Sequence, residues 1–174
     1  LVTAYRDDPL RDELSAAILV ARILEPTVDA EPVRAQLAAM SQRVAIAHPR
    51  GVAVADLVAF VRDEGFQAAA DAQSLDCSRI DRVLALQRGI PITLSIPYLM
   101  LGRAAGLTMQ GINFPGHFLV MAGDVLVDPL HARTLTREEC MQRLVDANLQ
   151  HLGASAFAQA TPDDMAVRML NNVK

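Results

Sequence analysis

One histidine and one aspartate are the first residues of this sequence that could do chemistry together. His117 lies near the start of one expected strand, and Asp128 lies near the end of the next. Two antiparallel strands joined by a tight turn place such residues side by side, so we expect the imidazole and the carboxylate to pair. An imidazole oriented in this way can move a proton. On the residues alone, a core histidine with satisfied ring nitrogens is an equally good interpretation.

A nucleophile could come from a hydroxyl or a thiol. Thr93 and Ser95 follow Pro91 at the start of an expected helix, and a hydroxyl there needs a base to deprotonate it. The simpler interpretation is that Thr93 braces the helix start. Cys77 precedes another expected helix, but the acidic Asp76 beside it favours the protonated thiol. Cys77 is therefore interpreted as a partly buried structural cysteine.

The other cysteine and the other histidines suggest no further site. Cys140 lies beside two glutamates in an expected helix and is interpreted as a packing residue. His131 could reach the same cleft as His117, although a position in a surface loop is the preferred interpretation. No two of the four histidines are four residues apart, so we expect no metal site, and we expect no cofactor.

Helical patterns dominate the first half of the chain and must position these residues. Apolar residues recur at steps of three and four in four segments, residues 12–25, 31–47, 54–64 and 77–87. Residues 67–76 have no periodicity and are expected to form a loop. Pro91 suits the first turn of a further helix. We expect Pro91 to Ala104 to be a buried helix whose N-terminus points at His117 and Asp128.

Short β-like runs follow this helix and predict an antiparallel meander. They cover residues 107–113, 117–121 and 125–127, with a turn signal at Gly123 and Asp124. The spacings of Thr136 to Glu139 and of Thr161 to Asp164 are those of capping boxes, and they predict two closing helices. Helices, then strands, then helices favour an α+β fold over a parallel doubly wound sheet.

Composition limits the class of protein. The 174 residues suit a single domain, and 52% hydrophobic with 21% charged residues is typical of a globular chain. A net charge of −4 gives no basic footprint for nucleic acid. The longest apolar stretch, Pro91 to Gly102, is shorter than the ~20 residues that span a bilayer, so we expect no membrane insertion. Two cysteines suit a reducing compartment, and we expect a cytoplasmic location.

Three sequence motifs resemble those of the bacterial SirB-one family. That family is a branch of the transglutaminase-like superfamily, which is related in fold to papain-type cysteine proteases. The motifs are GIPITL at residues 89–94, FPGHFL at residues 114–119 and DP at residues 128–129. The similarity extends over nearly the whole chain, because residues 64–66, 82–84 and 168–174 also resemble family segments.

The resemblance implies an α+β fold in one domain, residues 1–174. A helical N-terminal subdomain (1–66) would pack on a transglutaminase-like core (77–174) with a small antiparallel sheet. Active superfamily members place a Cys at a helix N-terminus, then a His on one strand and an Asp on the next. His117 and Asp128 take the last two positions. The helix that should present the Cys begins with Pro91 and Thr93 instead, and Cys77 lies fourteen residues too early.

These departures favour a degenerate domain, a pseudoenzyme that acts as a binding or scaffolding module with protein partners. The expected ligand-binding residues are Thr93, Asn113, Gly116 and His117, with an anion held between the helix N-terminus and the imidazole. The alternative is a hydrolase or acyl-transferase that uses Thr93, Ser95 or Cys77 with His117 and Asp128. The family's tetratricopeptide-like repeats would follow this domain and are absent from the chain. The sequence leaves the oligomeric state open.

Overall fold

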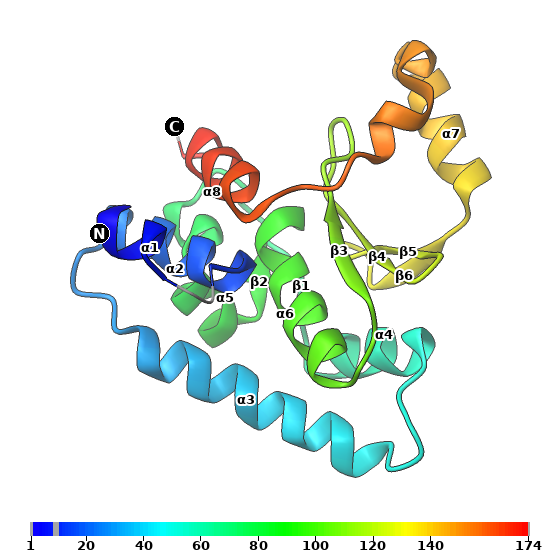
Figure 1. The fold of residues 1–174 in the computed structure, drawn as a ribbon. Helices are drawn as coiled ribbons and strands as arrows, with labels where there is room; N and C mark the ends of the chain where they lie inside the picture. Colours follow the sequence, from blue (N-terminus) through cyan, green and yellow to red (C-terminus); the bar gives the residue numbers. More distant parts are fainter. Residues whose placement is uncertain (1, 9–10, 174) are drawn as a thin grey trace.

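The computed structural model describes residues 2–8 and 11–173, so residues 1, 9, 10 and 174 lie outside the description, including the last residue of the family-like segment 168–174. Figure 1 shows helices packed on one side of a small sheet, with further helical segments beyond the sheet. The helices are α1 (Val2–Arg6), α2 (Glu13–Leu24), α3 (Ala30–Ala47), α4 (Val54–Asp63), α5 (Ile80–Leu86), α6 (Pro91–Ala104), α7 (Arg137–Asp146) and α8 (Pro162–Asn171), with 3-10 helices η1 (Leu75–Ser78) and η2 (Gln150–Phe157). The strands are β1 (Gln67–Ala68), β2 (Arg88–Gly89), β3 (Met109–Ile112), β4 (Leu119–Ala122), β5 (Val125–Asp128) and β6 (Arg133–Leu135).

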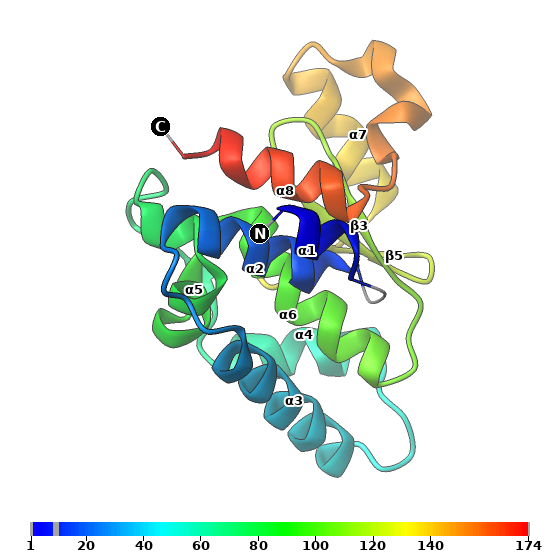
Figure 2. The same cartoon turned by 60° about the vertical axis from the view of Figure 1, so that its left-hand side comes forward.

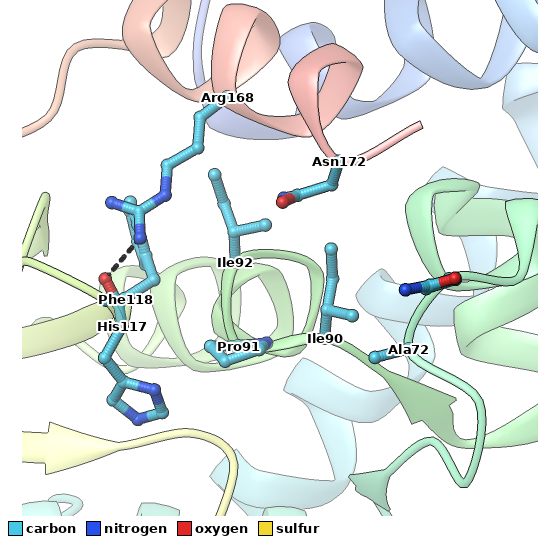
Figure 3. A pocket seen from close by; sticks show the side chains of 10 residues that line it. Ala72, Ile90, Pro91, Ile92, His117, Phe118, Arg168 and Asn172 are labelled. Carbon is cyan, nitrogen blue, oxygen red and sulfur yellow. Dashed lines mark hydrogen bonds between the residues drawn. The ribbon is translucent and has the colours of Figure 1, made fainter. Parts of the chain in front are cut away.

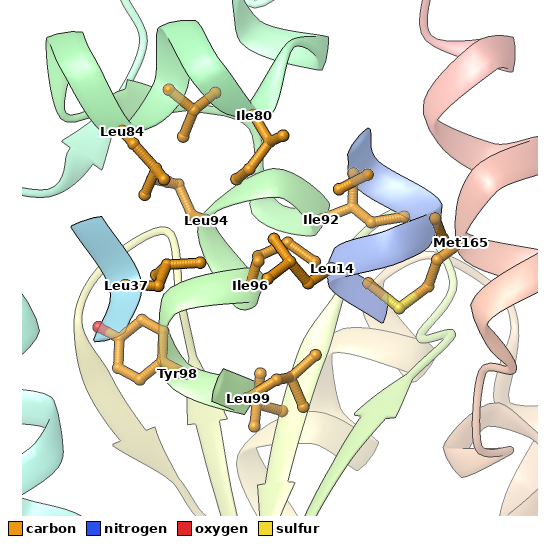
Figure 4. Packing of buried hydrophobic residues seen from close by; sticks show 14 of the residues in the cluster. Leu14, Leu37, Ile80, Leu84, Ile92, Leu94, Ile96, Tyr98, Leu99 and Met165 are labelled. Atoms are coloured by element: carbon orange, nitrogen blue, oxygen red, sulfur yellow. The ribbon is translucent and has the colours of Figure 1, made fainter. Parts of the chain in front are cut away.

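Helix α6 is the centre of the molecule. It packs against α2, α3 and α4 and against strands β3 and β4, and most of its residues are buried. Figure 4 shows Leu94 and Ile96 of α6 among Leu37 of α3, Leu84 of α5 and Met165 of α8. In Figures 1 and 2 the last helix, α8, lies over α2, so the two ends of the described chain meet. No helix in the described ranges is long and apolar enough to cross a membrane.

The antiparallel sheet has the order β3-β4-β5-β6 and separates two hydrophobic clusters. Val120 pairs with Val127, and both belong to the main cluster with α6. Leu126 pairs with Leu135, and both belong to a second cluster that includes Leu144 of α7. The alternation of strand side chains therefore fills a core on each face of the sheet. Because α7 and η2 cover its outer face, the molecule has three layers.

The α+β fold class predicted from the sequence is confirmed, and α6 has the predicted bounds. Residues 67–68 were expected in a loop but form β1, which pairs in parallel with β2. A two-residue strand has no periodicity to read, and its partner lies twenty-one residues away. Strand β6 was not predicted, since Arg133–Leu135 is too short to show alternation. His117 precedes β4 instead of starting it.

Candidate functional site

A tight turn places His117. The N–H of His117 donates to the carbonyl of Phe114 (3.1 Å), which closes a four-residue turn. Pro115 and Gly116 occupy its middle positions, and the φ of +68° at Gly116 is one that other residues rarely adopt. Phe118 is buried in the main core, so the chain is anchored on the far side of the histidine. His117 is thus fixed at its backbone before its side chain makes any contact.

Asp128, the last residue of β5, holds the imidazole from one side. Its Oδ1 lies 2.8 Å from Nε2 of His117 and accepts the N–H of Leu130 at 3.1 Å. Its Oδ2 lies 2.9 Å from Nδ1 of His131 and accepts from Nη2 of Arg143 at 3.2 Å. The carboxylate is fully buried, whereas the side chain of His117 is 13% exposed. Four donors therefore surround one buried carboxylate.

These contacts decide the charge state of Asp128. Burial by itself would raise the pKa of Asp128, but the hydrogen bonds from His117 and His131, the charge of His117 and the hydrogen bond from Arg143 outweigh it. The pKa therefore lies well below its ordinary value, and the carboxylate is ionised at neutral pH. An ionised carboxylate accepts a hydrogen bond from the Nε2–H of His117, which leaves the lone pair of the neutral ring on Nδ1. Among the residues that the structure describes, Nδ1 of His117 has no hydrogen-bond partner.

The hydroxyls at the start of α6 are both buried and both occupied. Thr93 donates to the carbonyl of Cys77 (2.7 Å), and its Oγ1 accepts the N–H of Ile90 (3.2 Å). Ser95 donates to the carbonyl of Ile92 (2.6 Å). Neither side chain has any solvent exposure. Thr93 therefore braces the junction between η1 and α6, and no hydroxyl of this helix start reaches solvent.

A pocket of about 340 Å³ lies between the start of α6, the His117 turn and α8 (Figure 3). Its lining residues are Ala72, Gln73, Ile90, Pro91, Ile92, Gly116, His117, Phe118, Arg168 and Asn172. Of the four expected ligand-binding residues, the structure brings Gly116 and His117 into this pocket. Thr93 lies in the core behind it, and Asn113 is absent from the lining. The side chain of Asn113 accepts a hydrogen bond from Arg168 instead.

Neither thiol is among the described residues that line the pocket. Cys77 is buried in η1, and its Sγ donates to the carbonyl of Asp71 (3.2 Å). Burial, and then the charges of Asp71 and Asp76, raise the pKa of the Cys77 thiol. Cys140 is buried in the second cluster, and burial raises the pKa of its thiol above the ordinary range. Both environments favour the unreactive, protonated form.

Three side chains at the end of the hairpin have the atoms of a metal site, although the sequence predicted none. One ligand atom each from His117, Asp128 and His131 lies within 4.8 Å of the others. Both carboxylate oxygens already accept two hydrogen bonds, one of them from the Arg143 guanidinium. A cation would have to displace these donors beside an existing positive charge. The arrangement suits an oriented imidazole better than a metal ion.

Two arginines and one histidine of this site were not assigned to it by sequence reasoning. Arg143 comes from α7, and His131 comes from the loop expected to lie at the surface. Arg168 comes from α8, where it lies beside Met165 and Met169 of the buried stripe. A charged residue at the margin of an apolar stripe is the one signal that could have indicated Arg168. Nothing local indicated Arg143, because only the packing of α7 brings it to Asp128.

Comparisons with known proteins give one family match and several relatives that align over part of the chain. A family model described as Transglutaminase-like superfamily matches residues 31–171. UPF0162 protein PA3419 of Pseudomonas aeruginosa is 31% identical over 96 residues, 53% of this chain and 36% of that protein. A UPF0162 protein of Xylella fastidiosa strain Temecula1 is 33% identical over 100 residues, 55% of this chain and 32% of that protein. F-box only protein 21 of Homo sapiens is 28% identical over 105 residues, 53% of this chain and 16% of that protein. The chain thus spans about a third of its bacterial relatives, and no solved structure matches it.

Proposed function

The chain belongs to the transglutaminase-like superfamily, and from this premise we propose that it is a binding domain that keeps a His–Asp pair without a nucleophile. One observation carries the proposal. Thr93 and Ser95, the hydroxyls at the helix start where active members present a thiol, are fully buried and donate to backbone carbonyls. A buried and occupied hydroxyl cannot attack a substrate in the pocket.

The retained pair has a use in binding. Asp128 fixes the tautomer and the orientation of His117, so Nδ1 is left as an acceptor in the neutral ring and as a donor in the protonated one. The pocket beside it, of about 340 Å³, lies in the size range of small-ligand sites. Its walls are mainly apolar, with a few polar groups from separate elements, which is the usual composition of such a site.

The finer assignment is also a proposal. We place the chain in the SirB-one branch of the superfamily because it carries the GIPITL, FPGHFL and DP motifs. In that branch the domain is followed by tetratricopeptide-like repeats, and such repeats bind protein partners along a concave face. A binding or scaffolding role that involves a protein partner follows from this assignment, and the two cysteines favour a cytoplasmic location.

The alternative function is a hydrolase or acyl-transferase that uses Thr93, Ser95 or Cys77 as its nucleophile. A fluorophosphonate probe and iodoacetamide, applied to the wild type and to His117→Ala, separate the two functions. A binding domain labels slowly with both reagents, and the histidine variant labels no more slowly than the wild type. Rapid labelling of one of these three residues that disappears in His117→Ala would establish the enzyme and overturn the proposal.

Binding itself is tested by amide chemical shifts. A library of small fragments should shift the amides of residues 90–92 and 116–118 in the wild type. Ala72→Trp adds a large side chain at the lining of the pocket and should abolish these shifts. Ala39→Trp, on the exposed face of α3, adds the same side chain elsewhere and should leave them unchanged. Shifts that survive Ala72→Trp would place binding outside this pocket.

A further inference from the structure

No acidic side chain of the described residues lines the pocket beside His117, although the chain is acidic. The sequence has 20 acidic and 16 basic residues, yet none of the ten lining residues is Asp or Glu. Among the lining residues that the structure describes, Arg168 and His117 are the two that can carry a charge, and that charge is positive. Gln73 and Asn172 add neutral amides. The ionised Asp128 that contacts His117 is also paired with Arg143. The charge that faces this pocket without a carboxylate partner among the described residues is therefore the guanidinium of Arg168, and it attracts an anion.

Arg168 has no carboxylate partner among the described residues. Its guanidinium donates to the carbonyl of His117 (2.6 Å), to the carbonyl of Phe114 (3.4 Å) and to the side chain of Asn113. These acceptors are all neutral, and the guanidinium also lies over the ring of Phe118, 5.7 Å from its centroid. Two other partly buried arginines of the chain, Arg103 and Arg143, each contact a buried carboxylate.

The cost of burying this cation is visible in its pKa. Arg168 is about half-buried, and desolvation lowers the pKa of its guanidinium below the ordinary value. An anionic ligand that entered the pocket would offset this desolvation, because it would supply the charge that the protein itself omits. The hydrogen bonds of Arg168 to the His117 turn hold the guanidinium in place before any ligand arrives.

We propose that the pocket takes a small ligand with one carboxylate on an apolar body, the carboxylate at Arg168 and the body against the start of α6. The inference rests on the proposed binding function. Arg168 carries one permanent positive charge, which one carboxylate balances, whereas a doubly charged phosphate would need a second permanent cation. Ile90, Pro91 and Phe118 supply the apolar wall. The volume of 340 Å³ equals that of roughly eleven water molecules, enough for a ligand the size of an acylated amino acid.

Two probes of nearly equal shape test this on the wild-type chain. N-acetyl-leucine carries the carboxylate, and N-acetyl-leucinamide replaces it with a neutral amide. At low salt the acid should shift the amides of residues 90–92 and 116–118 and bind about fivefold more tightly than the amide, or better. Raising the salt should reduce that preference. Equal affinities, shifts elsewhere, or no shift by either probe up to about 10 mM would overturn the inference.

Substitutions then assign the charge. Arg168→Gln should abolish the preference for the acid, and Arg168→Lys should retain part of it. Arg62→Gln, an exposed arginine on α4, removes the same charge outside the pocket and should change nothing. Arg168→Gln also removes the hydrogen bonds of Arg168 to the His117 turn, and the variant could fail to fold for that reason. The two probes and the salt series on the wild type then decide whether the pocket prefers the carboxylate. A pocket that binds both probes equally would refute the carboxylate and leave the binding function standing, whereas histidine-dependent labelling of Thr93, Ser95 or Cys77 would refute the proposed function whatever the two probes do.

Discussion

The end of the β4–β5 hairpin and the start of α6 face one pocket, but they use their polar groups differently. At the hairpin, Asp128 accepts hydrogen bonds from three side chains and from the N–H of Leu130, so the imidazole of His117 is oriented and its Nδ1 has no partner among the described residues. At the helix, Thr93 and Ser95 spend their hydroxyls on backbone carbonyls, so nothing is left for a substrate. The residues that orient the imidazole can thus be retained in a protein that lacks the nucleophile which that imidazole would activate.

Asp128→Ala gives the largest expected effect, because it removes the acceptor on which the hairpin side depends. Its loss leaves the donors of His117, Leu130 and Arg143 without the fully buried acceptor that they share. Breaking a buried charge pair in this way costs about 3 kcal/mol of unfolding free energy. Urea unfolding at pH 7 measures it, with Asp124→Ala in the exposed hairpin turn as the control, expected within about 0.5 kcal/mol of wild type. Equal losses of unfolding free energy in the two variants would show that the contacts of Asp128 do not stabilise the hairpin end.

Acid should weaken the hairpin side and leave the helix side alone. The pKa of Asp128 is lowered in the folded chain, so its contribution to stability is fully present above the unfolded pKa near 3.9 and is lost as the pH falls through the folded value. Unfolding free energy measured from pH 6 downward should therefore fall more steeply in the wild type than in Asp128→Asn. Parallel curves for the two proteins would mean that this carboxylate contributes no pH dependence.

The sequence predicted one side of this comparison better than the other. A hairpin is a local structure, so the pairing of His117 with Asp128 could be predicted, and the two side chains do meet. Pro91 gave the start of α6 through its fixed φ and its missing N–H. The positions of Arg143 and Arg168 depend on how α7 and α8 pack against elements far away in the chain. No local pattern records such packing, so the cationic part of the site could not be predicted.

Pro91→Cys would place a thiol at the start of α6, on the wall of the pocket, where a reagent can reach it. Pro91 lines the pocket with His117, at the first turn of a fourteen-residue helix. A helix N-terminus and a nearby imidazole both favour the thiolate. Iodoacetamide should label this thiol at pH 7 about tenfold faster than in the double variant Pro91→Cys/His117→Ala, a difference of about 1.4 kcal/mol.

Thr93→Cys is the matched control for that experiment, because its thiol would replace a fully buried hydroxyl. It should label slowly whether or not His117 is present. The labelling rate of the Pro91→Cys thiol could also be the same with and without His117. In that case the imidazole does not affect the start of α6, and the hairpin end and the helix start do not form one site.

Thr93→Val tests whether the hydroxyl on the helix side is structural. The change keeps the shape but strands the N–H of Ile90 and the carbonyl of Cys77, and each buried group left unpaired destabilises the fold. We expect a loss of about 2 kcal/mol in urea unfolding for the two unpaired groups, with N-acetyl-leucine binding unchanged. Ser155→Ala, which removes an exposed hydroxyl bonded to the carbonyl of Leu152, is the control with no measurable loss. Weaker ligand binding by Thr93→Val at unchanged stability would instead give Thr93 a role in the pocket.

His131→Ala should have the smallest effect, and it sharpens the comparison within the hairpin itself. His131 and His117 contact opposite oxygens of Asp128 at nearly the same distance, but the side chain of His131 is 58% exposed and that of His117 only 13%. Solvent screens the exposed contact, and water can replace the donor that is lost, so the expected cost is about 0.5 kcal/mol or less. Urea unfolding in 0.05 M and 1 M salt should show little difference between His131→Ala and wild type, whereas His117→Ala loses several times as much at both. A loss from His131→Ala as large as that from His117→Ala would mean that the carboxylate needs both imidazoles, and that His131 belongs to the site as fully as His117 does.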